Sequence, residues 1–128
     1  MEIGKEKYLK LSNIDAYKVA FHLSNLIWNE VTRWDYFAKD TVGKQFVNAA
    51  DSISANIAEG FGRYHKKDKI KFYRYASGSL KEALDWNEKS RVRSLIDQVT
   101  YDTFFKELES LPKLINQLIK YTNLALKS

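Results

Sequence analysis

The sequence predicts an all-α protein, an antiparallel up-down four-helix bundle, and three observations support this fold class. Apolar residues recur at three- and four-residue steps through four long segments, and no stretch shows the alternation that is typical of a strand. The chain contains one proline and five glycines, so few positions interrupt a helix. The links between the four segments are short, and short links favour antiparallel neighbours.

The composition predicts a single folded domain over residues 1–128. Hydrophobic residues make up 45% of the chain and aromatic residues 14%, which excludes disorder. No apolar run approaches the roughly 20 residues that span a bilayer, and the N-terminal residues lack the apolar region of a signal peptide. We therefore expect a cytoplasmic protein without a membrane partner. Because the chain has no cysteine, disulfides, thiolate catalysis and thiolate metal ligands are excluded.

The first helix is predicted from Ile14 to Thr32, with Asn13 as its N-cap. Its expected core stripe consists of Tyr17, Ala20, Phe21, Ser24, Ile27, Trp28 and Val31. A second apolar patch on a different side consists of Val19, Leu23 and Leu26. A helix with two apolar faces has more surface to bury than a monomeric bundle covers. The second patch therefore predicts contact with another copy of the chain.

The connector over residues 33–40 is expected to close one end of the core with its aromatic side chains, Trp34, Tyr36 and Phe37. The second helix is predicted over Val42–Glu59, capped by Asp40 or Thr41. Gly60 and Gly62 follow it, and we expect them to supply the left-handed geometry that ends a helix.

A ladder of polar residues runs beside the apolar face of this second helix. Its members are Gln45, Ser52, Asn56 and Glu59. Polar groups beside a core are costly unless they find partners. The ladder therefore predicts that this flank meets another helix or another subunit.

The third helix is predicted from about Lys67 to Ser90, and the fourth from Asp97 or Thr100 to Leu126. Pro112 falls inside the fourth helix, where a proline costs about 3 kcal/mol. We expect the fourth helix either to bend at Pro112 or to restart near residue 110.

Two residues of the third helix, Glu82 and Trp86, are expected at a subunit interface. Glu82 and Glu59 could form ion pairs with one of three arginines, Arg63, Arg74 or Arg91. Such pairs would set the register of an interface more than its stability. The alternative is that both are ordinary exposed carboxylates. Gly78, in the same helix, costs about 1 kcal/mol relative to alanine, so we expect it to make a close packing contact.

Basic residues cluster after the second helix. The net charge is +5, and six cations opposed only by Asp68 lie between positions 63 and 74. Cations on one helix face neutralise phosphates, and an aromatic ring can stack on an unpaired base. The predicted nucleic-acid contacts are Arg63, Lys66, Lys67, Lys71, Arg74, Lys81 and Tyr75. The alternative is a solvated outer helix face, which needs charged residues in any case.

Catalytic chemistry has little support in the sequence. His22 and His65 are the only histidines, and neither has a partner at metal-ligand spacing. The serines of the second and third helices lack a neighbouring histidine base. We therefore expect no catalytic residue, no metal and no cofactor.

The central third of the chain resembles a known family. Residues 52–63 read Ser-Ile-Ser-Ala-Asn-Ile-Ala-Glu-Gly-Phe-Gly-Arg, and Phe72, Ala76 and the sequence Gly-Ser-Leu-Lys-Glu at 78–82 follow. This pattern resembles the bacterial four-helix bundle proteins first noticed as products of 23S rRNA intervening sequences. The resemblance implies an antiparallel bundle that assembles into a homopentameric ring. That family is similar to the basic accessory proteins of diversity-generating retroelements, which bind nucleic acid and work with a reverse transcriptase.

Two functions follow as alternatives. The first is a non-enzymatic homo-oligomer, with a pentamer favoured, that binds RNA or DNA through its basic face without much sequence preference. The second is an interaction scaffold that recruits a protein such as a reverse transcriptase or another nucleic-acid enzyme, without binding nucleic acid itself.

Overall fold

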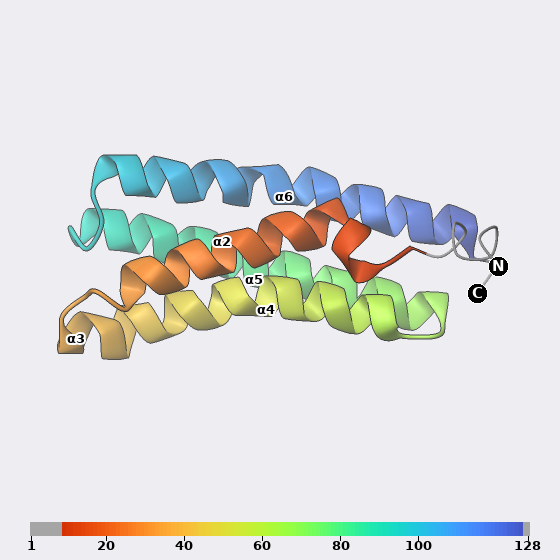
Figure 1. The fold of residues 1–128 in the computed structure, drawn as a ribbon, viewed down its shortest axis with the longest axis horizontal. Helices are drawn as coiled ribbons and strands as arrows, with labels where there is room; N and C mark the ends of the chain where they lie inside the picture. Colours follow the sequence, from red (N-terminus) through yellow and green to blue (C-terminus); the bar gives the residue numbers. More distant parts are fainter. Residues whose placement is uncertain (1–8, 127–128) are drawn as a thin grey trace.

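The computed structural model describes residues 9–126, which form four long helices in one bundle (Figure 1). The long helices are α2 (Asp15–Val31), α4 (Lys44–Gly62), α5 (Lys66–Val92) and α6 (Gln98–Ala125). A short 3₁₀ turn, η1 (Leu11–Asn13), precedes α2. Consecutive long helices run in opposite directions, and the described residues contain no strand. The predicted antiparallel up-down four-helix bundle is confirmed.

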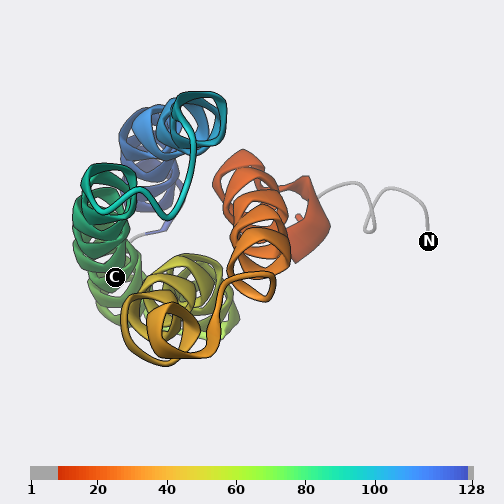
Figure 2. The same ribbon diagram turned by 90° about the vertical axis from the view of Figure 1, so that its left-hand side faces the viewer.

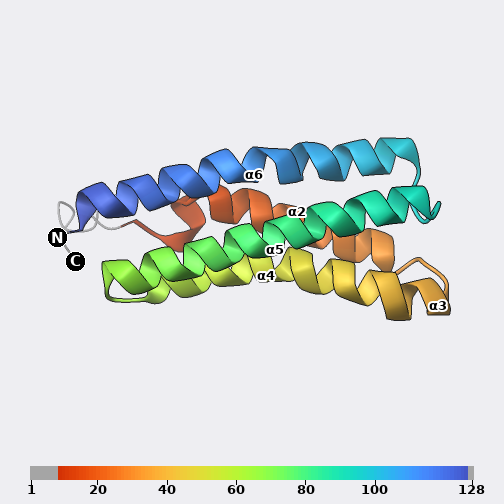
Figure 3. The same ribbon diagram turned by 180° about the vertical axis from the view of Figure 1, so that it is seen from behind.

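The helices surround a common axis in the order α2, α4, α5, α6 (Figure 2). Helix α4 packs on α2 and α5, and α6 packs on α5 and α2. One end of the bundle holds the turn between α4 and α5, and we call it the α4–α5 end (Figure 3). The opposite end holds the α2–α4 connection and the α5–α6 loop, and we call it the α3 end.

The core extends along the whole bundle. Its fully buried large side chains come from all four helices: Leu23, Ile27, Phe46, Ile53, Ile57, Tyr73, Leu108, Leu111 and Ile115. Burying one such side chain contributes about 1.5–3 kcal/mol. Periodic burial of this kind stabilises long helices that are separated only by short connections.

Helix α2 is rotated about its axis relative to the prediction. Its buried face consists of Ala16, Ala20, Leu23, Ser24, Ile27 and Val31. Phe21 and Trp28, which the sequence assigned to the core, are 52% and 54% exposed. Leu23 is fully buried in this chain, so its predicted place in an oligomer interface is wrong. The N-cap is Ile14 rather than Asn13, whose side chain instead accepts the Lys10 N–H.

The connector to α4 is helical for most of its length, which the sequence analysis did not predict. A short helix, α3 (Tyr36–Ala38), is capped by Asp35, whose side chain accepts the Ala38 N–H at 3.0 Å. It continues through a π-helical turn, η2 (Lys39–Gly43), directly into α4. Asp40 and Thr41 therefore lie inside this helical segment and do not cap it.

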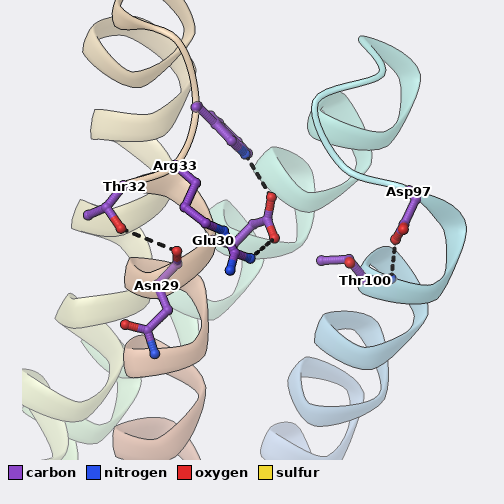
Figure 4. A network of polar contacts seen from close by, with 7 residues as sticks. Asn29, Glu30, Thr32, Arg33, Asp97 and Thr100 are labelled. Carbon is purple, nitrogen blue, oxygen red and sulfur yellow. Dashed lines mark hydrogen bonds and ion pairs between the residues drawn. The ribbon is translucent and has the colours of Figure 1, made fainter.

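Of the three connector aromatics, only one closes the core. Trp34 is buried, whereas Tyr36 and Phe37 are 78% and 76% exposed. Glu30 holds Trp34 in place by accepting its indole N–H at 3.0 Å, and the same carboxylate accepts a hydrogen bond from Arg33 at 3.0 Å (Figure 4). The expectation for Trp34 is confirmed, and that for the other two is wrong.

The glycines that follow the second predicted helix do not end it by left-handed geometry. Helix α4 continues to Gly62, and no described residue except Ser94 has a positive φ. Gly60 is instead a packing position. A Cβ built there would lie 2.7 Å from Cε1 of Tyr73 and 2.9 Å from the backbone oxygen of Lys69. The absent side chain lets α4 and α5 approach each other closely.

Two further expectations about helix interiors have different outcomes. Gly78 has open space around its Cα, so the close contact expected for it is absent within this chain. Helix α6 runs without interruption through Pro112, so it does not restart before the proline. Asp97 caps α6 by accepting the Thr100 N–H at 2.8 Å, which confirms the earlier of the two predicted starts (Figure 4).

Candidate nucleic-acid interface

The α4–α5 end is a tight turn that exposes a run of cationic and aromatic side chains. Helix α4 ends at Gly62, the backbone is extended at Arg63 and His65, and α5 begins at Lys66. Because the turn is short, the side chains of residues 63–67 project from one tip of the bundle.

Lys69 is the one cation of this segment that serves the fold. Its Nζ donates to the carbonyl oxygens of Phe61 at 2.7 Å and Gly60 at 3.5 Å in the last turn of α4. The Gly60 oxygen also accepts the backbone N–H of Arg63 at 3.2 Å. Burial lowers the pKa of the Lys69 ammonium. Lys69 therefore acts as a cap and is not available to a ligand.

Arg63 has both a charge partner and an aromatic partner. Its guanidinium lies 2.8 Å from the Glu59 carboxylate and 4.5 Å from the centre of the Phe72 ring. The ion pair that the sequence suggested for Glu59 is present with Arg63. Glu82 forms no ion pair within residues 9–126 and is exposed. Because Glu59 offsets its charge, Arg63 contributes less free positive charge than the lysines that follow it.

The outer face of α5 carries the uncompensated charge. Lys67, Lys71 and Arg74 are exposed and follow one another at four- and three-residue steps on one face of the helix. Lys81 is also exposed and lies about two turns after Arg74. Lys66 is half-buried at the start of the helix. Within residues 9–126, none of these five side chains forms an ion pair.

Two exposed tyrosines accompany these cations. Tyr75 is 50% exposed and meets the Phe72 ring edge-to-face at 5.3 Å. Tyr64 is 88% exposed and meets the His65 ring edge-to-face at 5.0 Å. The predicted contact set contains Tyr75 but not Tyr64. The signal that could have found Tyr64 is its position in a turn between a helix-ending glycine and the cluster of lysines.

The predicted interface residues occupy two opposite sides of the bundle. Gln45 and Trp86 line a groove on the α4–α5 side, and helical spacing places the rest of the polar ladder along that side. Leu26 lies in a shallow groove between α2 and α6. Val19 lies seven residues, or about two turns, before Leu26 on α2. Both side chains pack against the core and are only partly buried.

This groove on the α4–α5 side is an open cavity of about 700 Å³ near the α3 end. Its apolar lining includes Phe37, Val42, Trp86 and Leu95. Polar groups at its rim include Asp40 and Arg93. Neither the cavity nor its exposed aromatic rim was predicted from the sequence.

The described residues offer little to catalysis. Within residues 9–126, no three His, Cys, Asp or Glu side chains gather in a way that could hold a metal ion. Both histidines are exposed. None of the helices in the same range combines the length and apolarity that a membrane span needs.

Comparison with known proteins agrees with the resemblance seen in the sequence. A sequence model of the 23S rRNA-intervening sequence protein family matches residues 12–117. The chain belongs to this family. Its fold is similar to a crystal structure from Bacteroides thetaiotaomicron, described as a protein of unknown function from the S23 ribosomal protein family, with a TM-score of 0.73. The two sequences are 21% identical, and the match covers 82% of this chain and 98% of that one. No curated protein matches the chain.

Proposed function

We propose that this member of the 23S rRNA-intervening sequence protein family is a non-enzymatic homo-oligomer, with a pentamer favoured, that binds RNA or DNA. The observation that carries the proposal is the row of exposed cations on the outer face of α5, none of which has a carboxylate partner among residues 9–126. Arg63, Lys66, Lys67, Lys71, Arg74 and Lys81 contact the phosphate backbone, and Tyr75 stacks on a base. Such contacts bind all sequences similarly, because phosphates carry no sequence information.

Unburied apolar surface on α2 supports association. Phe21 and Trp28 share one side of the helix and remain half-exposed, and Tyr17 packs against Phe21 with ring centres 5.7 Å apart. The ladder on α4, in which Ser52 and Asn56 are half-buried and Gln45 and Glu59 exposed, adds polar surface that a second copy would satisfy. A cyclic oligomer needs two different faces that fit each other, and the predicted interface residues lie on two opposite sides. Repeated copies of one modest basic patch would raise avidity.

Charge reversal at α5 tests the nucleic-acid interface. Lys67→Glu, Lys71→Glu and Arg74→Glu together should weaken binding to every sequence. They should also make the dependence of log K on log salt less steep, by about 0.7 for each lost single-strand contact and about 0.9 for each duplex contact. Affinity is measured by fluorescence anisotropy with single- and double-stranded RNA and DNA.

The matched control places the same charge change elsewhere on the bundle. Lys44, Lys106 and Lys113 are exposed on α4 and α6, and reversing all three alters net charge equally. This control should reduce affinity much less than the α5 variant. Equal losses in the two variants would remove the assignment of the site to α5, and no binding of the wild-type chain would contradict the nucleic-acid function.

Native mass measurement tests the assembly. We expect a pentamer, and we expect Phe21→Ser with Trp28→Ser to lower the oligomer number, because the substitutions remove exposed apolar area without touching the core. A wild-type chain that is a compact monomer in dilute solution would contradict the proposal.

The scaffold function is favoured by a different observation, the apolar cavity near the α3 end. Its rim carries Phe37, which is 76% exposed, and such exposed aromatic groups beside a groove suit a protein partner. If none of the four nucleic acids binds and a nucleic-acid enzyme co-purifies with the wild-type chain but not with Phe37→Ser, the scaffold is the better account.

A further inference from the structure

The most exposed large side chain at the α4–α5 end has no part in the fold. Tyr64 is 88% exposed, so it buries almost none of the apolar area that would stabilise the bundle. Within the described part of the chain, its one aromatic neighbour is His65, whose ring meets it at an interplanar angle of 85°. An edge-to-face neighbour of this kind cannot cover both faces of a ring. The Tyr64 ring therefore presents an open face at the tip of the bundle.

The surroundings of Tyr64 are those of a nucleic-acid contact. Its chain neighbours are Arg63 on one side and His65, Lys66 and Lys67 on the other, and the turn contains no carboxylate between Glu59 and Asp68. A single exposed aromatic side chain is ordinary on a protein surface. One that stands in the middle of the most cationic segment of the chain is placed where a phosphate backbone would pass.

A second aromatic ring stands at the far end of the same cationic row. From Lys67 to Arg74 the helix rises about 10 Å, at about 1.5 Å per residue. A stacked strand carries one phosphate for about every 3.4 Å along its axis, so this length corresponds to about three phosphates. Tyr75 follows Arg74 directly and is half-exposed. The row of cations is thus flanked by one exposed tyrosine at each end.

We propose that the α4–α5 end selects unpaired over paired nucleic acid, with Tyr64 and Tyr75 as stacking platforms at the two ends of the Lys67–Lys71–Arg74 row. This inference rests on the proposed function and adds the class of nucleic acid. Bases in a duplex stack on each other and cannot offer a face to an inserted ring, whereas unpaired bases can. Stacking on an aromatic side chain contributes about 1–3 kcal/mol for each base and tolerates any sequence.

The test compares a single-stranded oligonucleotide with a hairpin duplex of the same composition, at one salt concentration, by fluorescence anisotropy. Tyr64→Ala should weaken single-strand binding about 5- to 150-fold, the range that corresponds to one lost stack. Duplex affinity should be unchanged. The salt dependence should also be unchanged, because the variant removes no charge. Tyr64→Phe should bind like the wild type, since stacking needs the ring and not the hydroxyl.

Two controls separate stacking from other effects. Tyr36→Ala removes another highly exposed tyrosine, at the α3 end, and should leave both affinities unchanged. A single strand that contains abasic sites keeps the phosphates and lacks bases at those sites. The wild-type chain should bind it less tightly than the intact strand. Tyr64→Ala should reduce this difference, and Tyr64→Ala combined with Tyr75→Ala should nearly abolish it.

The outcomes distinguish this inference from the function on which it rests. If the wild-type chain binds both nucleic acids and Tyr64→Ala changes neither affinity, or lowers both equally, the stacking role is wrong and the nucleic-acid function stands. Tighter binding to the duplex than to the single strand would also overturn the selection. If the wild-type chain binds neither, the proposed function fails and this inference fails with it.

Discussion

The two ends of the bundle balance their charges in opposite ways. At the α3 end, cations pair with carboxylates three or four residues away: Arg33 with Glu30, Lys89 with Asp85 and Arg91 with Glu88. At the α4–α5 end, Lys18 pairs with Asp15 on α2 and Arg63 with Glu59, but no lysine between residues 64 and 81 has such a partner among residues 9–126. The net positive charge of the chain is thus concentrated at one end. Local pairing, rather than overall composition, decides where a charged ligand can bind.

The two ends also differ in how they use aromatic residues and helix termini. The α3 end buries Trp34 and begins its helices with the acidic caps Asp35 and Asp97. The α4–α5 end exposes Tyr64 and satisfies the carbonyl groups of α4 with a lysine, Lys69. The α3 end is closed by buried side chains, which support the fold. The α4–α5 end leaves an aromatic ring and several cations in solvent, where they are free to bind a ligand.

The largest expected effect tests the closed end. Trp34→Ala should lower the free energy of unfolding by about 3–5 kcal/mol, because it empties a buried aromatic site and leaves Glu30 without the indole N–H. Tyr36→Ala, two residues away and exposed, should change it by less than about 0.5 kcal/mol. Urea denaturation at fixed protein concentration measures both. Similar losses for the two variants would show that Tyr36 is covered in solution.

The next effect tests the close approach of α4 and α5. Gly60→Ala should destabilise the protein by about 1–3 kcal/mol, since the new Cβ meets Tyr73 and the backbone oxygen of Lys69 below 3.0 Å. Gly78→Ala should stabilise it by about 0.5–1 kcal/mol, because this helical position is open and alanine favours helix. Thermal or urea unfolding distinguishes the two signs. A loss of stability in Gly78→Ala would mean that another copy packs against this position.

A smaller effect separates two neighbouring lysines. Lys69→Met should lower the free energy of unfolding by about 1–2 kcal/mol, because two carbonyl groups at the end of α4 lose their cationic donor. Lys67→Met should leave stability within about 0.5 kcal/mol of the wild type and weaken nucleic-acid binding instead. Urea denaturation and anisotropy are measured on the same samples. A destabilised Lys67→Met would show that Lys67 has a structural partner.

The smallest expected effects are on how the free energy of unfolding depends on pH. Tyr73 acts at alkaline pH and Glu88 at acid pH. Burial raises the pKa of the Tyr73 phenol from 10.0 to about 12. In the unfolded chain it ionises near its ordinary pKa, so its contribution to stability is complete below that pKa and falls as pH rises from there toward 12. Hydrogen bonds from Arg91 and Tyr101 lower the pKa of Glu88. Its contribution is present above the ordinary glutamate pKa and is lost as pH falls below it.

Two conservative variants assign these pH dependences to the two ends. Tyr73→Phe should reduce the alkaline loss of stability and leave the acid side unchanged, because it removes only the titrating hydroxyl. Glu88→Gln should reduce the acid loss. It should also change the alkaline side, because the hydrogen bond to Glu88 raises the pKa of the Tyr101 phenol. The free energy of unfolding is measured as a function of pH for both. If Tyr73→Phe leaves the alkaline loss unchanged, or Glu88→Gln leaves the acid loss unchanged, the assigned group does not cause that dependence.

Helix positions were the most predictable feature of the chain. The predicted bounds of the first, third and fourth helices agree with α2, α5 and α6 to within two residues. The second was predicted to begin at Val42, although a helical segment already begins at Tyr36. The signal was present, since Asp35 is a good capping residue, but the cluster of aromatic residues after it resembled a connector. A π-helical turn has no sequence signature of comparable strength.

The candidate site was predictable in its spacing and not in its contacts. The helical spacing of Lys67, Lys71 and Arg74 was enough to place them on one outward face of the third helix, and their exposure agrees with that placement. The role of Lys69 depends on carbonyl groups eight and nine residues earlier, which come close only when the turn has formed. The exposure of Tyr64 likewise depends on the path of that turn. Whether the site binds nucleic acid stays a prediction.

By itself, the sequence determined the all-α class, the four long helices and the outward row of cations, because each follows from a repeat along a single helix. Only the tertiary structure decided which side of α2 faces inward and whether Gly60 ends a helix or lets two helices meet. Helix α2 has apolar residues over more than half of its circumference, so several rotations satisfy its period. The choice among them depends on the shapes that the other three helices present, and no local pattern contains that information.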